Sequence, residues 1–134
     1  ARLGCGVLYD SLQSSEVSAR LGAAHREAGA ETGRVLIRRV WIGPPPEAEM
    51  AAQMDHYRSY ANEAATKNWT DDSLVHGDTP VAAAEALLDV LAESDCDTVN
   101  VRVHVKGLTP AQVDDQLARH ADGFVDAVRA GLGG

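Results

Sequence analysis

Residues 98–105 constrain the fold of this chain more than any other stretch. Valines at positions 99, 101, 103 and 105 alternate with four polar residues, Thr98, Asn100, Arg102 and His104. Alternation with a period of two, carried by β-branched residues, is typical of a β-strand with one apolar and one polar face. A helix start, in which a capping threonine precedes proline, lies on each side, at residues 79–80 and 109–110. The stretch therefore predicts a strand between two helices, with its valine face covered by helices.

The composition restricts the class of protein and of partner. The chain has 134 residues, which is enough for one small domain or for part of a larger one. A formal net charge of -8 and the lack of a Lys/Arg cluster exclude a nucleic-acid footprint and an anionic membrane surface. Because aromatic residues make up only 4% of the chain, we expect an aliphatic core.

Cysteine and histidine usage predicts no metal site. Cys5 and Cys96 have no further cysteine or histidine at metal-ligand spacing, so we expect free thiols. With no recognisable secretory signal or membrane-spanning run, this predicts a cytoplasmic protein without a membrane partner. His-Glu-x-x-His and Gly-x-Ser-x-Gly motifs are missing, which disfavours metal-dependent and serine hydrolases. His25 and His120 fall on predicted helices, where we expect both to be solvated.

Strands and helices alternate along the rest of the chain. Residues 2–9 predict a short strand whose glycines mark either a turn or a close approach to the backbone. A helix is expected from Ser14 or Ser15 to about Ala28, with Leu21 on its buried face. Residues 35–42 predict a second strand, and residues 80–92 and 110–131 predict two further helices. This alternation predicts an α/β fold with a parallel sheet and right-handed crossovers.

Two adjacent arginines interrupt the otherwise apolar second strand. Arg38 and Arg39 point to opposite faces, because side chains alternate along a strand. A strand that is apolar on both faces is typical of a sheet covered by helices, so at least one of the arginines must be buried. A buried arginine requires a partner, and we expect a structural ion pair, with an anionic ligand as the alternative.

The segment at about residues 44–75 predicts a helical insertion. A Gly-Pro-Pro-Pro break precedes a helix over residues 47–67, and residues 70–75 predict a polar loop. Insertions after a strand are where α/β enzymes build lids and substrate walls. The candidate contacts are His56, Tyr57, Tyr60 and Trp69. The alternative is that the methionine and tyrosine stripe of this helix simply packs in the core.

Three βα units leave one face of the sheet and two edges open. The polar row of Asn100, Arg102 and His104 fits a strand that lines a polar barrel interior. It fits equally well a half-exposed strand at the edge of a small sheet. The residue pattern alone leaves both interpretations open.

Four stretches together resemble one family, the luciferase-like flavin-dependent monooxygenases. Residues 99–110 (Val-Asn-Val-Arg-Val-His-Val-Lys-Gly-Leu-Thr-Pro), followed by Gln116 and Leu117, resemble the closing strand and last helix of that family. Residues 1–11 look like its late glycine-containing strand, and residues 35–43 look like the next, arginine-bearing strand. Residues 77–80 (Gly-Asp-Thr-Pro) look like the start of its penultimate helix. The stretches occur in the family's order and cover nearly the whole chain.

The resemblance implies a partial (β/α)8 TIM barrel, consisting of about the last three βα units. It also implies a reduced cofactor, FMN or the deazaflavin F420, at the carboxyl ends of the strands. FMN members of the family activate dioxygen and F420 members transfer hydride. By position, the residues implied near that face are Tyr9, Asp10, Ser11, Trp41 and His104, with Asn100 and Arg102 deeper in the lumen. No catalytic residue of the family carries over to a position in this chain.

The resemblance also implies what the chain lacks. The first two-thirds of such a barrel and most of its glycine-rich phosphate site have no counterpart here, and the sequence starts at Ala1 directly before strand-like residues. We therefore expect a fragment of an oxidoreductase that is incomplete for catalysis by itself, with the N-terminal part of the barrel as its partner. The alternative is a small α/β binding or assembly module that self-associates through open sheet edges and has no catalytic activity.

Overall fold

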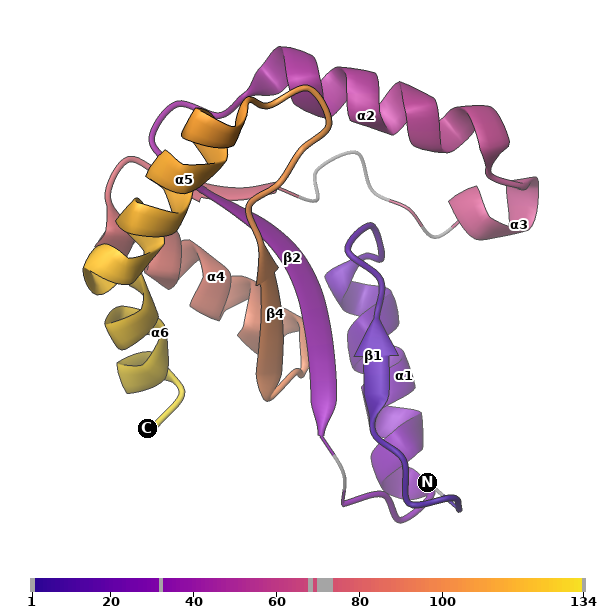
Figure 1. The fold of residues 1–134 in the computed structure, drawn as a ribbon. Coiled ribbons are helices and arrows are strands. Elements are labelled where there is room, and N and C mark those ends of the chain that lie inside the picture. The colour runs from indigo at the N-terminus through magenta and orange to yellow at the C-terminus, as the bar shows by residue number, and fades with distance from the viewer. Residues whose placement is uncertain (1, 32, 68, 70–73, 134) are drawn as a thin grey trace.

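The chain folds as an α/β structure around a parallel sheet, as the alternation of strands and helices predicted (Figure 1). The computed structural model describes residues 2–31, 33–67, 69 and 74–133. Its strands are β1 (Val7–Tyr9), β2 (Arg34–Ile42), β3 (Leu74–Gly77) and β4 (Thr98–Arg102). Its α-helices are α1 (Ser15–Glu27), α2 (Glu47–Tyr60), α3 (Glu63–Thr66), α4 (Pro80–Ser94), α5 (Pro110–Arg119) and α6 (Val125–Gly131).

Strand β2 is the centre of the four-stranded sheet, and each of the other strands pairs with it in parallel. β1 pairs with residues 34–36 of β2, β3 with residues 39–42, and β4 with residues 35–39. Because β1 and β4 share partner residues on β2, they must lie on its opposite edges. β1, β2 and β4 are therefore neighbours in the order in which they occur along the chain.

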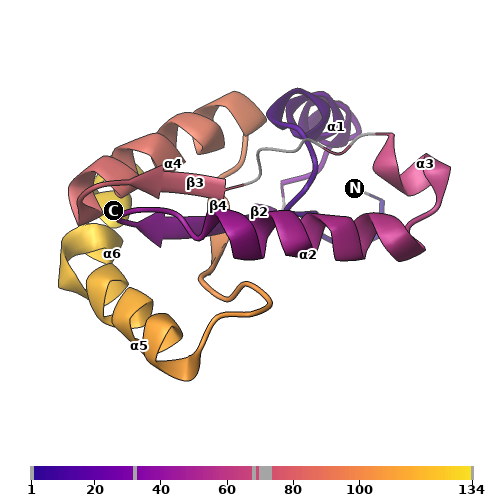
Figure 2. The ribbon, with the colours of Figure 1, turned by 90° about the horizontal axis from the view of Figure 1, so that it is seen from above.

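The apolar core lies between the sheet and the helices on one of its faces. α1 and α4 lie side by side on that face, and α6 packs against α4 (Figure 2). Val99 and Val101 of β4 contact this core, so the predicted covering of the valine face by helices is confirmed. The buried residues that form the core are Tyr9, Leu36, Val40, Ile42, Val75, Ala83, Ala84, Leu87, Leu91, Cys96, Phe124 and Val128.

The carboxyl end of β2 is completed by a side chain. β4 pairs with β2 only as far as Arg39, which leaves the backbone of Ile42 without a strand on that edge. Gln116 of α5 fills the gap: its Oε1 accepts from the Ile42 amide at 2.9 Å and its Nε2 donates to the Ile42 carbonyl at 3.0 Å. Since an unpaired buried backbone group is costly, this glutamine fixes α5 against the end of the sheet.

The predicted helix starts are confirmed by their caps. The side chain of Ser14 accepts from the Val17 amide, and Thr79 caps α4 with proline in its first turn. Thr109 and Gln112 form the predicted capping box. The turn from β3 into α4 requires glycine, since a Cβ on Gly77 would lie 2.3 Å from the amide nitrogen of Ala83.

Several predicted boundaries and faces were wrong. The alternating strand ends at Arg102 and not at residue 105, and β3 begins at Leu74, inside the predicted polar loop, whose residues 70–73 lie outside the described part of the chain. The predicted 47–67 helix is two helices, because Ala61 leaves α2 in an extended conformation. The last helix is interrupted near Gly123, which has a φ of 92°. Leu21 is exposed, since α1 instead packs through small residues.

Candidate functional site

One face of the sheet carries no covering helix along its length, and its side chains define the candidate site. Register places Leu8, Ile37 and Asn100 on this face, because strand residues that pair share a face. Arg39 and Arg102 are themselves Cα partners, so both lie on this face near the carboxyl ends of β2 and β4. Helix α2 crosses above these strand ends (Figure 1). We call this uncovered side the open face.

Arg39 is buried on the open face, and no carboxylate of the described residues pairs with it. It is only 4% exposed. Its Nη2 donates to the Tyr57 hydroxyl at 2.9 Å, and its Nη1 lies at 3.5 Å from Ser11 Oγ, the limit of a hydrogen bond. Its Nε is buried with no hydrogen-bond partner, and its guanidinium lies 5.8 Å from the centre of the Tyr57 ring. The prediction of a structural ion pair is therefore wrong for Arg39.

Arg38 points to the opposite face and is fully occupied by the backbone. It is 5% exposed and donates to the carbonyls of Ser11 at 3.1 Å and Gln13 at 2.8 Å, with further contacts to the carbonyls of Asp10 and Ile37. Burial lowers the pKa of its guanidinium from the usual range. It holds the loop after β1 against β2, so its role is structural, although it also lacks the expected ion pair.

Tyr57 connects the insertion helix to the sheet and presents a free hydroxyl proton. Its oxygen accepts from Arg39 and also from Gln53 Nε2 at 3.1 Å. The orientation of the Gln53 amide is fixed, because its Oε1 accepts from the Lys106 amide at 2.8 Å. With both acceptor positions of the Tyr57 hydroxyl used, its own proton has no acceptor within the described part of the chain. The hydroxyl is therefore poised to donate to a ligand.

A cavity of about 410 Å³ lies where these groups meet. Arg102 reaches it from β4, and Tyr57 and Tyr60 reach it from α2. The Tyr57 ring lies edge-on to Tyr60 and Trp69, with centroids 6.1 and 6.5 Å away. The complete lining is Asp10, Ser11, Leu12, Tyr57, Tyr60, Ala61, Asn62, Trp69 and Arg102. A smaller hollow of about 320 Å³ shares three of these residues and continues along the open face over Leu8 and Ile37.

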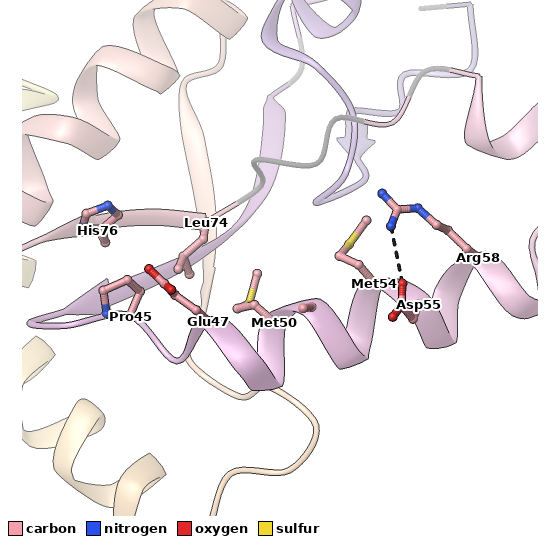
Figure 3. Close-up of a pocket in the computed structure, with 9 residues that line it drawn as sticks. Pro45, Glu47, Met50, Met54, Asp55, Arg58, Leu74 and His76 are labelled. Atoms are coloured by element: carbon pink, nitrogen blue, oxygen red, sulfur yellow. Dashed lines mark ion pairs between the residues drawn. The ribbon is translucent and has the colours of Figure 1, made fainter.

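A second large cavity, of about 440 Å³, lies on the other side of α2, between that helix and β3 (Figure 3). Met50 and Met54 of α2 and Leu74 of β3 make its wall largely apolar. Its charged rim includes Asp55 and Arg58, which form an ion pair with each other at 3.6 Å. Glu47 and His76 also line this cavity, but none of the candidate residues from the sequence does, so we assign the candidate site to the Arg102 cavity.

The structure brings six of the eleven candidate residues into that one cavity: Asp10, Ser11, Tyr57, Tyr60, Trp69 and Arg102. The sequence named Arg39 only as one of two strand arginines whose partner is an ion pair or an anionic ligand, because its burial behind Tyr57 depends on how α2 folds back over the sheet. Only the presence of an arginine inside an apolar strand hinted at it.

The other five candidates lie elsewhere. Tyr9 is buried in the core on the helix-covered face, where burial raises the pKa of its hydroxyl. Trp41 is buried and donates to the Pro44 carbonyl at 2.8 Å. His56 is exposed and lies edge-on to Tyr60 at 5.4 Å. Asn100 and His104 are exposed, and His104 lies beyond the end of β4.

Two further buried titratable groups, His120 and Cys96, lie outside the lining of this cavity. His120 is buried and not solvated as expected, and its Nδ1 lies 2.7 Å from the Gln116 carbonyl while its Nε2 has no partner. Burial lowers the pKa of His120 and raises the pKa of the Cys96 thiol. No disulfide joins Cys5 and Cys96.

The described residues contain no metal cluster and no membrane-spanning helix. Across the described residues, no group of histidine, cysteine and carboxylate side chains is placed to hold a metal ion. In the same residues, no helix has both the length and the apolar character needed to cross a bilayer. No model of a known protein family matches the chain, and no curated protein matches it.

Proposed function

We propose that this chain is the C-terminal portion of a luciferase-like (β/α)8 barrel and belongs to an oxidoreductase that uses FMN or F420. The observation that carries the proposal is the sheet itself. β1, β2 and β4 are parallel neighbours in chain order, with their crossover helices on one face. Strands added in one direction with right-handed crossovers place all helices on the same side, as in a barrel, whereas a doubly wound sheet places them on both.

The open face supports the same proposal. Its side chains are the mixed polar and apolar set expected of a barrel interior, with Arg39 and Arg102 at the carboxyl ends of the strands. Barrel enzymes place their active sites at that end. The short strand β3 pairs with β2 on the β1 side and belongs to the insertion, so it does not disturb the order of the three main strands.

The residues of the cavity fit a flavin or deazaflavin ring. Tyr57, Tyr60 and Trp69 provide aromatic edges for a flat ring system, while Arg102 and the Tyr57 hydroxyl provide donors for ring carbonyls or for a phosphate. When bound, FMN supplies dioxygen activation and F420 supplies hydride. In this proposal the chain's own residues hold and orient the ligand, and α2 shields the cavity from one side.

Titration of the purified chain with FMN and with F420, followed by cofactor fluorescence, tests the proposal. We expect saturable quenching by one of the two cofactors, weakened by the substitution Tyr60→Ala, which removes an exposed aromatic edge of the cavity. Leu132→Ala, at an exposed position on the C-terminal tail, is the control. The absence of saturable quenching by either cofactor would contradict the proposal.

A second candidate function is a self-associating assembly module. The observation that favours it is the exposure of Leu8, which is 62% exposed on the edge strand β1. An apolar residue on an open strand edge is a site for pairing with another chain, either a second copy or the remainder of a barrel. Light scattering measures the oligomeric state and so tests pairing with a second copy. A defined oligomer that Leu8→Lys dissociates supports self-association, and a monodisperse monomer counts against it.

A further inference from the structure

Two arginines stand side by side at the carboxyl end of the sheet, and neither forms an ion pair with a carboxylate of the described residues. Arg39 and Arg102 are Cα partners on neighbouring strands, and like charges in such a pair destabilise a sheet. At the amino end of the same strands, Arg34 has Asp97 at 3.1 Å. With 20 acidic and 12 basic residues, the sequence has carboxylates to spare. Within the described residues, an arginine at the amino end of the sheet therefore has a counter-charge, and the two arginines at the carboxyl end have none.

Three hydrogen-bond donors at this place have no acceptor within the described residues. The guanidinium of Arg102 forms no hydrogen bond or ion pair, although it lines the cavity. The Tyr57 hydroxyl proton is free, because its oxygen already accepts twice. Behind Tyr57, the buried Nε of Arg39 is unpartnered. The buried Nε of Arg39 and the half-buried hydroxyl of Tyr57 are costly to leave unpaired, whereas the exposed guanidinium of Arg102 is hydrated and available to a ligand.

We propose that Arg102 and the Tyr57 hydroxyl, backed by the charge of Arg39, bind the oxyanion of an organic ligand. Charge-assisted hydrogen bonds from a guanidinium and a hydroxyl are the usual means of holding a carboxylate, sulfonate or phosphate. The edges of Tyr57, Tyr60 and Trp69 receive the flat apolar part of the ligand. The proposal rests on this geometry and holds whether or not the chain binds a flavin.

Among the described residues, Asp10 is the one carboxylate that lines the cavity, and its own loop already binds it. Asp10 Oδ1 accepts from the Leu12 amide at 2.9 Å, and Ser11 Oγ lies 3.4 Å from it. Within the described residues Asp10 forms no ion pair with Arg102, so the guanidinium of Arg102 stays available to a ligand anion.

The oxyanion has two sources, and paired probes distinguish them. A substrate brings a carboxylate or sulfonate, for which benzoate and its neutral isostere benzamide are the probes. A cofactor brings a phosphate, for which FMN and riboflavin, which have the same ring, are the probes. Each pair differs only in the group that the arginines are proposed to hold.

Calorimetric titration of the full chain with these four probes tests the proposal. We expect benzoate to bind about ten-fold or more tightly than benzamide, and Arg102→Met to abolish that preference. Arg102→Lys retains part of it, because the charge remains. Arg129→Met is the matched control, since Arg129 is an exposed arginine on α6, and we expect wild-type affinity. If Arg102→Met instead abolishes a preference for FMN over riboflavin, the site holds the cofactor phosphate.

Other outcomes overturn the proposal. Equal affinities within both pairs of probes, or no binding of any probe at millimolar concentration by folded protein, exclude an oxyanion site. A preference for the anionic probes that is unchanged in Arg102→Met places the anion elsewhere. Because Arg102 is exposed, its substitution is not expected to impair folding, and circular dichroism checks this. Anion binding without flavin quenching would contradict the proposed cofactor while it supports this site.

Discussion

Replacing Arg39 by methionine is expected to leave the free energy of unfolding almost unchanged, although the side chain is 4% exposed. The substitution loses one good hydrogen bond, to Tyr57 at 2.9 Å, which contributes about 1.5–3 kcal/mol because the donor is charged. It removes a buried Nε without a partner, which costs about 1–3 kcal/mol in the native protein. It also removes the repulsion from Arg102, about 1 kcal/mol or less. These contributions cancel to within about 1 kcal/mol.

Arg38 provides the matched control, because it lies next in the same strand and is 5% exposed. Arg38→Met leaves the buried carbonyl of Ser11 and the carbonyl of Gln13 without their donor, at about 1–3 kcal/mol each. We therefore expect a loss of about 3 kcal/mol. Urea unfolding with linear extrapolation measures both variants, and their m-values show whether the transition stays two-state.

The difference between the two variants decides what Arg39 is for. A small effect of Arg39→Met together with lost anion binding means that the charge is kept for a ligand at no gain in stability. A loss from Arg39→Met as large as that from Arg38→Met would refute the reasoning, because it would show that the folded chain itself satisfies Arg39. Breaking a buried ion pair typically costs about 3–5 kcal/mol, so the two cases are well separated.

Three further predictions concern the scaffold. Gln116→Leu is expected to lower the free energy of unfolding in urea by about 2–4 kcal/mol, since it leaves the amide and carbonyl of Ile42 unpaired; a loss below about 0.5 kcal/mol would contradict this. Gly77→Ala is expected to lower the melting temperature sharply in circular dichroism, because its Cβ would meet the Ala83 backbone at 2.3 Å; an unchanged melting temperature would show that the turn relaxes. Burial lowers the pKa of His120 in the folded chain, so below pH 6.5 the unfolded chain binds more protons than the folded chain. The contribution of His120 to stability is therefore intact above the unfolded pKa of about 6.5, and it is lost as the pH falls from there toward the folded pKa. His120→Gln is expected to remove that part of the pH dependence in urea titrations, and a parallel pH profile in the two proteins would refute the assignment.

Local chemistry made the helix starts and the strand character predictable. The caps at Ser14, Thr79 and Thr109 act within one turn of backbone, and the structure has all three. The alternating valines likewise predicted which face of β4 meets the helices. The ends of elements were less predictable. β4 ends at Arg102, where its pairing with β2 ends, although the alternation of valines and polar residues continues to residue 105.

The candidate site could be predicted only in part, for the same reason. The sequence marked Asp10, Tyr57 and Arg102 as polar or aromatic residues near strand ends or in the insertion. It did not indicate that they share one cavity, because that depends on how α2 crosses the sheet. The prediction for Tyr9 was also right only in part. The residue lies at a strand end as predicted, but its side chain points into the core and not toward the cavity.

By itself, the sequence determined strands β1, β2 and β4, the capped helix starts, the parallel α/β class and the valine face of β4, because each follows from periodicity and capping over a few neighbouring residues. The tertiary structure alone decided that Arg39 and Arg102 are neighbours and that Tyr57 lies over the first of them. Register and crossover geometry join residues that are far apart in the chain, and no local pattern encodes such distances. The unpaired charge on the open face is therefore a property of the folded sheet.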